Sequence, residues 1–198
     1  MIIGITGGLA TGTSTAARYI ASDFNAVVIS ADKIAHSQLK SNKPFMKKLV
    51  LRFGKDIIGK QGSIDRKRLA EKAFSNKSKH KKLCQIAYPI IIADISDRIK
   101  KLYRQNLKNI VIDGAMLIES GFYKKCDFII VVTASLPLQV QRCVEKKILA
   151  KNALFRIRFQ MPLYKKVKYA DYIIDNGGNL RELYDRCKEI IENIKNGK

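Results

Sequence analysis

The first fifteen residues constrain the fold more than any other part of the chain. They read MIIGITGGLATGTST, a short apolar run followed by a glycine-rich turn. The spacing of Gly7, Gly12 and Ser14 fits the phosphate-binding loop (P-loop) pattern G-x-x-x-x-G-K-[ST], with Thr13 at the lysine position. In this pattern backbone N–H groups and a helix N-terminus hold phosphate. We therefore predict a buried strand, a phosphate-binding turn and a helix, without the ammonium group that usually contacts the β- and γ-phosphates.

Length and cysteine usage favour one soluble domain. The 198 residues suffice for one α/β core with an inserted lobe, and no apolar run approaches the roughly 20 residues of a membrane span. Met1 leads directly into the first predicted strand with no secretory signal, which favours a cytoplasmic protein. The cysteines lack metal-ligand spacing, which favours free thiols over disulfides or zinc. They are Cys84, Cys126, Cys143 and Cys187.

The chain is strongly basic. Its 38 Lys and Arg residues against 17 acidic residues give a net charge of +21, a balance typical of proteins that bind nucleic acid, anionic membranes or phosphorylated substrates. The basic residues are spread along the chain and do not alternate with aromatic residues as in an RNA-binding sheet. We expect solvated basic faces and phosphate-bearing small molecules as partners, with no specific nucleic acid and no membrane. The oligomeric state is left open.

Strand and helix patterns alternate along the chain. Near-continuous apolar runs rich in β-branched residues predict a parallel sheet covered on both faces. These runs are residues 2–5, 26–30, 109–113, 127–133 and 172–175, and the helices of the core are expected from about residues 14, 138 and 180. Between residues 32 and 104 apolar residues recur at three-to-four spacing, which predicts a helical lobe. Breaks in this lobe fall at 42–44, 54–62 and 76–78, and a basic stretch covers 146–158.

Further motifs follow in a fixed order. They are Gly4 to Ser14; Ala31-Asp32-Lys33-Ile34-Ala35-His36; Phe53-Gly54; Gly62-Ser63-Ile64-Asp65-Arg66 with Leu69; Asp113 with Leu117 and Glu119; Gln139 with Arg142; Ala153-x-x-Arg156-Ile157-x-x-Gln160; and Ala170-Asp171-x-x-Ile174-Asp175-Asn176-x-Gly178. In this order and spacing the chain resembles, over nearly its whole length, the dephospho-CoA kinases. That family uses a P-loop to phosphorylate the ribose 3′-hydroxyl in the last step of coenzyme A synthesis.

The resemblance implies a fold and a domain plan. The fold is α/β, a P-loop NTPase-type parallel sheet flanked by helices, with an inserted helical substrate lobe and a small lid. Residues 1–31 and 105–198 would form the nucleotide-binding core, residues 32–104 the acceptor-binding lobe, and residues 143–162 the lid. The whole chain, 1–198, would then be a single kinase domain.

ATP and Mg²⁺ are the implied cofactors, and dephospho-CoA is the implied acceptor. The hydroxyl of Ser14 is placed to reach the metal. Asp113 ends an apolar strand and could be a second metal ligand or simply the acid that starts a loop. The expected ATP-binding residues are Gly7, Gly8, Leu9, Ala10, Thr11, Gly12, Thr13, Ser14 and Thr15 in the loop, Arg142 and Lys146 in the lid, and Asn176 and Gly178 after the last strand.

Two residues are expected to be catalytic. Asp32 follows the second strand, at the edge of the sheet where open α/β folds bind ligands, and the family resemblance assigns it to the 3′-hydroxyl. Its alternative role is to cap the following helix. Arg142 would stabilise charge on the transferring phosphoryl group. The expected acceptor-binding residues are Asp32, His36, Asp65 and Arg66.

Four positions depart from the family pattern. Thr13 replaces the P-loop lysine, Tyr88 precedes Pro89 where the family has histidine, Lys146 replaces an arginine, and Gly114-Ala115-Met116 replaces Val-Pro-Leu. Loss of one preorganised donor typically costs about 10²- to 10³-fold in rate. Three hypotheses follow. The chain is a working kinase with Lys146 or Lys147 as the cation, a weak or inactive member that binds nucleotide or CoA, or a P-loop kinase of another nucleoside or nucleotide.

Overall fold

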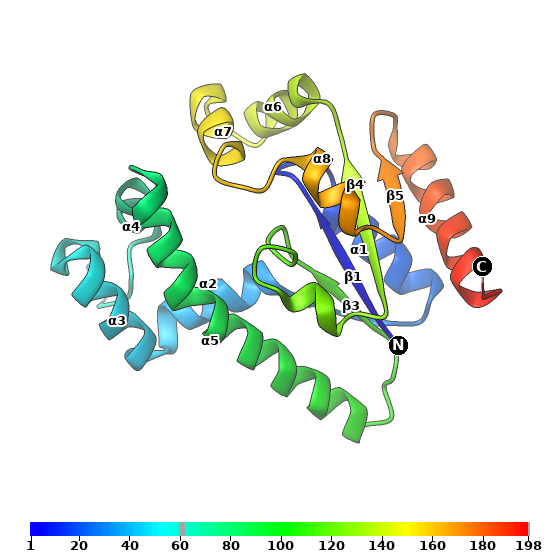
Figure 1. Cartoon of the computed structure of the whole chain (residues 1–198), viewed down its shortest axis with the longest axis horizontal. Coiled ribbons are helices and arrows are strands. Elements are labelled where there is room, and N and C mark those ends of the chain that lie inside the picture. Colours follow the sequence, from blue (N-terminus) through cyan, green and yellow to red (C-terminus); the bar gives the residue numbers. More distant parts are fainter. Residues whose placement is uncertain (60–61, 198) are drawn as a thin grey trace. The chain divides into compact units, whose positions relative to one another are not determined.

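The computed structural model describes residues 1–59 and 62–197, and it divides into two compact units. The first unit comprises Met1–Ser30 together with the chain from Ile99 onward, and the second comprises Ala31–Arg98. Residues 60 and 61, in the predicted break at 54–62, and residue 198 lie outside the described residues. Figure 1 shows both units and labels most of their helices and strands.

A five-stranded parallel sheet forms the centre of the first unit, which confirms the predicted fold class. Its strands are β1 (Ile2–Gly7), β2 (Val27–Ser30), β3 (Ile110–Asp113), β4 (Phe128–Thr133) and β5 (Tyr172–Asp175). Their order across the sheet is β2-β3-β1-β4-β5. Because all strands are parallel, their carboxyl ends lie at one edge. In the register of the sheet, Asp113 pairs with Ile5 on one side and with Ser30 on the other.

Alternating side chains of the central strands bury the two faces of this sheet. On one face, Ile130 and Val132 of β4 pack into a cluster with helices α1 (Thr13–Asp23) and α9 (Leu180–Lys195). On the other face, Ile129 and Val131 pack with Ile118 and with the chain around helix α8 (Leu163–Lys166). Successive strand residues point to opposite faces, so a run that is apolar throughout requires cover on both sides.

Short helical segments connect the strands of the first unit. Helix α6 (Leu136–Glu145) follows β4, and helix α7 (Ala150–Ile157) lies within the predicted basic stretch. Lys147, between them, adopts a left-handed backbone with φ of 61°. The 3₁₀ turns η2 (Phe122–Lys125) and η3 (Val167–Tyr169) precede β4 and β5.

The second unit is built mainly of helices and has its own core. It contains α2 (Ala31–Ser41), α3 (Lys43–Phe53), the turn η1 (Lys55–Ile57), α4 (Arg66–Ala73) and most of α5 (Lys77–Arg104). Its buried cluster is built from Phe45, Leu49, Phe53, Ile57, Ile64, Leu69 and Ala73. Phe45, Leu49, Phe53, Leu69 and Ala73 lie in runs of helical spacing, whereas Ile57 and Ile64 come from the segment between these runs.

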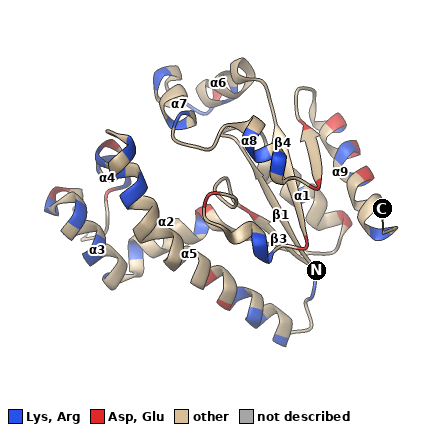
Figure 2. Ribbon diagram, viewed as in Figure 1, with Lys and Arg blue, Asp and Glu red and all other residues tan. Residues whose placement is uncertain are grey.

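Charge and polarity agree with a chain that exposes its basic residues to water. Lys and Arg are distributed over the helices of both units (Figure 2). Among residues 1–59 and 62–197, no helix combines the length and the apolar composition that a membrane crossing requires. All four cysteines are free thiols, and burial raises the pKa of Cys126 and of Cys187 to about 12.

Helix α9 depends on a side-chain cap. Asn179 accepts hydrogen bonds at Oδ1 from the backbone N–H groups of Arg181 (2.9 Å) and Glu182 (3.1 Å). We expect Asn179→Ala to lower the free energy of unfolding by about 1 kcal/mol, because two N–H groups in the first turn of α9 lose their acceptor. Urea unfolding followed by circular dichroism measures this. Asn179→Ser keeps an acceptor oxygen and is the control, and equal losses in both variants would show that the cap contributes nothing.

Candidate phosphate-binding and catalytic site

The P-loop is closed by hydrogen bonds within its own turn. Thr11 donates to the carbonyl oxygen of Gly8 twice, from its backbone N–H (3.3 Å) and from its hydroxyl (3.0 Å). Ala10 and Gly12 adopt left-handed backbones, with φ of 59° and 99°. These two residues reverse the chain between the end of β1 and the first turn of α1, so the loop has the compact form that the glycine spacing predicts.

Close packing leaves no room for side chains at two glycines of this loop. A Cβ atom on Gly7 would lie 2.4 Å from the carbonyl oxygen of Val132, and one on Gly12 would lie 2.2 Å from Nδ2 of Asn176. Asn176 follows β5, is 6% exposed and donates from Nδ2 to the carbonyl oxygen of Thr11 at 2.8 Å. Asn176 therefore supports the loop from the neighbouring strand. Its predicted contact with ATP stays a prediction.

At Gly178, the second glycine after β5, an added Cβ atom would meet a side chain of helix α9. A Cβ atom on Gly178 would lie 1.9 Å from Oε2 of Glu182, in the first turn of α9. Because this atom ends an exposed, flexible side chain, a Cβ atom at position 178 would require only that the Glu182 side chain move. The predicted contact of Gly178 with ATP stays a prediction.

Backbone donors of the loop are available to an anion. Among the described residues, the N–H groups of Ala10, Gly12, Thr13 and Ser14 donate to no carbonyl group or side chain. The first N–H groups of α1 belong to this set, and the positive end of the helix dipole lies at the same place. Backbone groups in such an arrangement are suited to an anion without any contribution from the side chain of residue 13.

A hydroxyl and a carboxylate meet beside the loop. The Oγ of Ser14 donates to Oδ2 of Asp113 at 2.7 Å, and Asp113 is only 7% exposed. Both are hard oxygen ligands of the kind that Mg²⁺ prefers. No group of three or more His, Cys, Asp or Glu residues suited to a metal is present among the described residues. A Mg²⁺ site of this type needs only one or two protein ligands, because substrate phosphates and water complete it.

Helix α6 carries two polar side chains that bear on the site, Gln139 and Arg142. The Nη1 of Arg142 is buried and has no hydrogen-bond partner among the described residues. Gln139 donates from Nε2 to the carbonyl oxygen of Ala134 at 2.9 Å, and its Oε1 would lie 2.8 Å from a Cβ atom on Gly8. A buried guanidinium N–H without a partner is free to bind an anion. Lys146 lies exposed at the end of the same helix.

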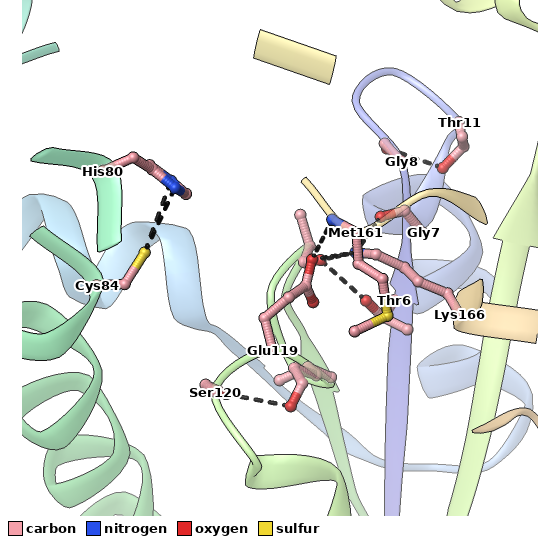
Figure 3. Close-up of polar contacts among 12 residues, drawn as sticks. Thr6, Gly7, Gly8, Thr11, His80, Cys84, Glu119, Ser120, Met161 and Lys166 are labelled. Carbon is pink, nitrogen blue, oxygen red and sulfur yellow. Dashed lines mark hydrogen bonds and ion pairs between the residues drawn. The ribbon is translucent and has the colours of Figure 1, made fainter. Parts of the chain in front are cut away.

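A fully buried lysine, Lys166, contacts the start of the loop, and no sequence pattern indicated it. The Nζ of Lys166 donates to the carbonyl oxygens of Gly7 (3.0 Å) and Ala115 and pairs with Oε1 of Glu119 at 3.1 Å (Figure 3). Burial lowers the pKa of Lys166, and the charge of Glu119 opposes that shift. Glu119 also accepts a hydrogen bond from the backbone N–H of Met161 at 2.9 Å. Glu119 is therefore part of a buried ion pair.

The predicted acceptor-binding residues lie in the second unit. Asp32 is in the first turn of α2, and Asp65 caps α4 by accepting from the N–H groups of Lys67 (2.9 Å) and Arg68 (3.1 Å). Burial lowers the pKa of His36, and the positive charge of Arg66 lowers it further, while Asp32 raises it. His36, Asp32 and Arg66 thus influence one another electrostatically within this unit. Their contact with an acceptor stays a prediction.

A P-loop on the central strand of a parallel sheet, with a hydroxyl and a carboxylate beside it, defines the class of P-loop kinases. The fold is shared with a solved shikimate kinase from Acinetobacter baumannii, which has a TM-score of 0.56 and 14% identity and covers 100% of this chain and 94% of that chain. At this identity the likeness shows the fold alone.

Sequence comparison identifies the family within this class. The family model for dephospho-CoA kinase matches residues 1–182. The dephospho-CoA kinase of Aquifex aeolicus (strain VF5) is 35% identical over 192 residues, which are 97% of this chain and 96% of that protein. A solved dephospho-CoA kinase from Campylobacter jejuni is 30% identical, has a TM-score of 0.68 and covers 99% of this chain and 98% of that chain. The chain belongs to the dephospho-CoA kinase family, which confirms the resemblance.

The packing of Gly12 yields a prediction for nucleotide binding. In Gly12→Ala the new methyl group meets the amide of Asn176, and the left-handed backbone adds about 1–2 kcal/mol of strain. We expect the ATP dissociation constant to rise by at least about 10-fold, because the loop must move to relieve the contact. Isothermal titration calorimetry measures it.

Gly121→Ala is the matched control for Gly12→Ala. Gly121 also has a left-handed backbone, with φ of 78°, but a Cβ atom there meets nothing within 4 Å. It should show the strain without the loss of ATP binding. Equal ATP affinity in the two variants would mean that the contact with Asn176 does not hold the loop.

Proposed function

We propose that this chain transfers the γ-phosphoryl group of ATP to the ribose 3′-hydroxyl of dephospho-CoA and so produces coenzyme A. The observation that carries this proposal is the hydrogen bond between Ser14 and Asp113 beside a complete P-loop backbone. Membership of the dephospho-CoA kinase family supports the choice of acceptor. The reaction would take place in the cytoplasm, where the free thiols of the chain stay reduced.

The P-loop would bind the triphosphate through its backbone. The N–H groups of Ala10, Gly12, Thr13 and Ser14, which have no partner among the described residues, would hold phosphate oxygens together with the N-terminus of α1. Arg142, whose buried Nη1 has no hydrogen-bond partner in the described part of the chain, would donate to oxygens whose negative charge grows in the transition state. Phosphoryl transfer depends mainly on such positioning and charge stabilisation. These residues therefore provide most of what the donor side of the reaction requires.

Ser14 and Asp113 would hold Mg²⁺ when ATP binds. Bound there, Mg²⁺ supplies charge neutralisation on the β- and γ-phosphates. The chain's own contribution is to keep the two oxygens at a fixed spacing, because Asp113 ends β3 and Ser14 lies in the first turn of α1. Dependence of turnover on added Mg²⁺ tests this assignment.

Asp32 would act on the acceptor. It lies two residues along the chain from Ser30, and Ser30 pairs with Asp113 in the register of the sheet. A carboxylate in this place can accept the proton of the 3′-hydroxyl or orient that hydroxyl for attack. His36, Asp65 and Arg66 would bind other groups of dephospho-CoA.

The site needs a cation in place of the P-loop lysine. Thr13 brings no charge, and the three N–H groups of the Lys166 ammonium are already donated to Gly7, Ala115 and Glu119. Lys146 and Lys147, both exposed after α6, remain as the candidates in the lid. A lid lysine would reach the phosphates only when ATP is bound, so turnover would depend on the lid more than in a kinase with a P-loop lysine.

Restoring the lysine tests the proposed function directly. We expect Thr13→Lys to raise turnover by at least about 10-fold, because the loop backbone is complete and only the charge is missing. ADP release from ATP and dephospho-CoA, with and without Mg²⁺, measures it. Thr13→Met adds similar length without charge and should give no gain. Absence of coenzyme A formation by both the unaltered chain and Thr13→Lys would overturn the proposal.

The role of Asp32 has its own test. We expect Asp32→Asn to reduce transfer to the 3′-hydroxyl by about 10²- to 10⁴-fold while leaving the ATP dissociation constant nearly unchanged, because the carboxylate acts on the acceptor. Asp97→Asn, which changes an exposed carboxylate of α5, is the control. A parallel loss of ATP affinity in Asp32→Asn would assign Asp32 to the metal or to the structure of the loop.

A further inference from the structure

We propose that Lys166 is a positioning residue for the P-loop. Together with Glu119, it fixes the first peptide of the loop to the place where the lid segment rejoins the core. The inference rests on the proposed function, because it concerns how the loop holds ATP. Neither Lys166 nor its pairing with Glu119 was indicated by the sequence pattern.

Every hydrogen that the Lys166 ammonium can donate is used. One goes to the carbonyl oxygen of Gly7 at 3.0 Å, one to the carbonyl oxygen of Ala115, and one to Oε1 of Glu119 at 3.1 Å (Figure 3). An ammonium group has three donors and no acceptor. Lys166 therefore has no hydrogen left for a phosphate oxygen. It acts on the nucleotide through the peptide between Gly7 and Gly8, and it is no substitute for the missing P-loop lysine.

The hydrogen bond from Lys166 to Gly7 determines the orientation of the peptide between Gly7 and Gly8. Gly7 ends β1, and its carbonyl oxygen accepts a hydrogen bond from the Lys166 ammonium group. The peptide therefore cannot rotate without breaking a charge-assisted hydrogen bond. Hydrogen bonding at the carbonyl oxygen of a peptide also polarises its N–H group, which belongs to Gly8. The charge of Lys166 thus both orients and strengthens one donor of the loop.

Glu119 extends this arrangement to the lid. Its Oε1 accepts from Lys166 and from the backbone N–H of Met161 (2.9 Å), which follows α7. Its Oε2 is buried and has no hydrogen-bond partner among the described residues. The negative charge of Glu119 is therefore balanced by Lys166. Removal of the cation would leave a buried carboxylate uncompensated at the end of the lid segment.

The carbonyl oxygen of Ala115 joins the third segment to the same ammonium group. It accepts from Lys166 and also from the hydroxyl of Thr6 at 3.2 Å. Ala115 lies two residues beyond Asp113, the residue that pairs with Ser14. One buried cation consequently links the end of β1, the chain after β3 and the chain after α7. A shift of any one of these segments would be transmitted to the P-loop.

Lys166→Met tests the inference, because methionine has nearly the same length and volume but no charge. We expect the ATP dissociation constant, measured by calorimetry without acceptor, to rise by at least about 10-fold. The KM for dephospho-CoA should stay within about twofold of the unaltered chain, because no loop contact with the acceptor is lost. Lys165→Met, which removes the exposed neighbouring lysine of the same helix, should change neither constant.

Two further variants separate positioning from general stability. Lys166→Arg keeps a cation with enough donors for the same three acceptors and should restore most of the ATP affinity. Ile190→Ala destabilises the core cluster under α9 and should lower the melting temperature with unchanged ATP affinity. An ATP affinity that merely follows the melting temperature across these variants would overturn the positioning role.

Should Lys166→Met fail to fold, Glu119→Gln decides the question. It keeps the shape of the side chain but removes the charge that holds Lys166, and it should weaken ATP binding with the acceptor KM unchanged. Unchanged ATP affinity in Glu119→Gln would overturn the inference. Because ATP binding is measured without acceptor, a chain that binds ATP but makes no coenzyme A would contradict the proposed function and leave this inference standing.

Discussion

The P-loop keeps its shape because three of its carbonyl oxygens accept hydrogen bonds from side chains. The carbonyl oxygen of Gly7 accepts from Lys166, that of Gly8 accepts from Thr11, and that of Thr11 accepts from Asn176. A peptide whose carbonyl group is held in this way presents its N–H group to the opposite side. The phosphate-binding surface therefore depends on side chains that contact no phosphate, and these side chains come from α8, the loop itself and the end of β5.

In such a site, one set of groups binds the phosphate and a different set neutralises its charge. Backbone N–H groups and the dipole of α1 suffice to hold a phosphate group. Neutralising the charge that develops during transfer needs cations, and here they would come from Arg142, from Mg²⁺ at Ser14 and Asp113, and from a lysine of the lid. Lys166 adds charge near the loop, but its donors are occupied. The absence of a lysine at position 13 therefore bears on the rate of transfer much more than on whether nucleotide can bind.

The sheet and the P-loop could be predicted because each depends on local sequence. Strands buried on both faces must be apolar throughout, and close packing leaves little room for side chains at Gly7 and Gly12 of the loop. The lobe was predicted for a similar reason, since its helices bury one face within their own unit. Ser14 and Asp113 were each predicted as metal ligands, and the structure adds that they are hydrogen-bonded to each other.

Lys166 could not be predicted because burial is a property of three-dimensional surroundings. It stands among Lys165 and Lys168, both exposed, in a chain with 38 basic residues, and nothing in the spacing distinguishes it. Its partner Glu119 is 47 positions earlier in the numbering, and Gly7 is 159 positions away. Polar networks of this kind depend on contacts between distant segments, whereas apolar periodicity reports only the local face.

The crowding at Gly7 and Gly12 changes what a glycine pattern says about a protein. A side chain at either position would overlap Val132 or Asn176 in this chain alone, with no nucleotide involved. A descendant that had lost catalysis would therefore retain both glycines as long as it folded in the same way. Residue 13, whose side chain is only partly buried, can change more readily when the reaction no longer matters. In this fold the two glycines are required by the packing of the chain, whereas the neighbouring polar residues are required by the reaction.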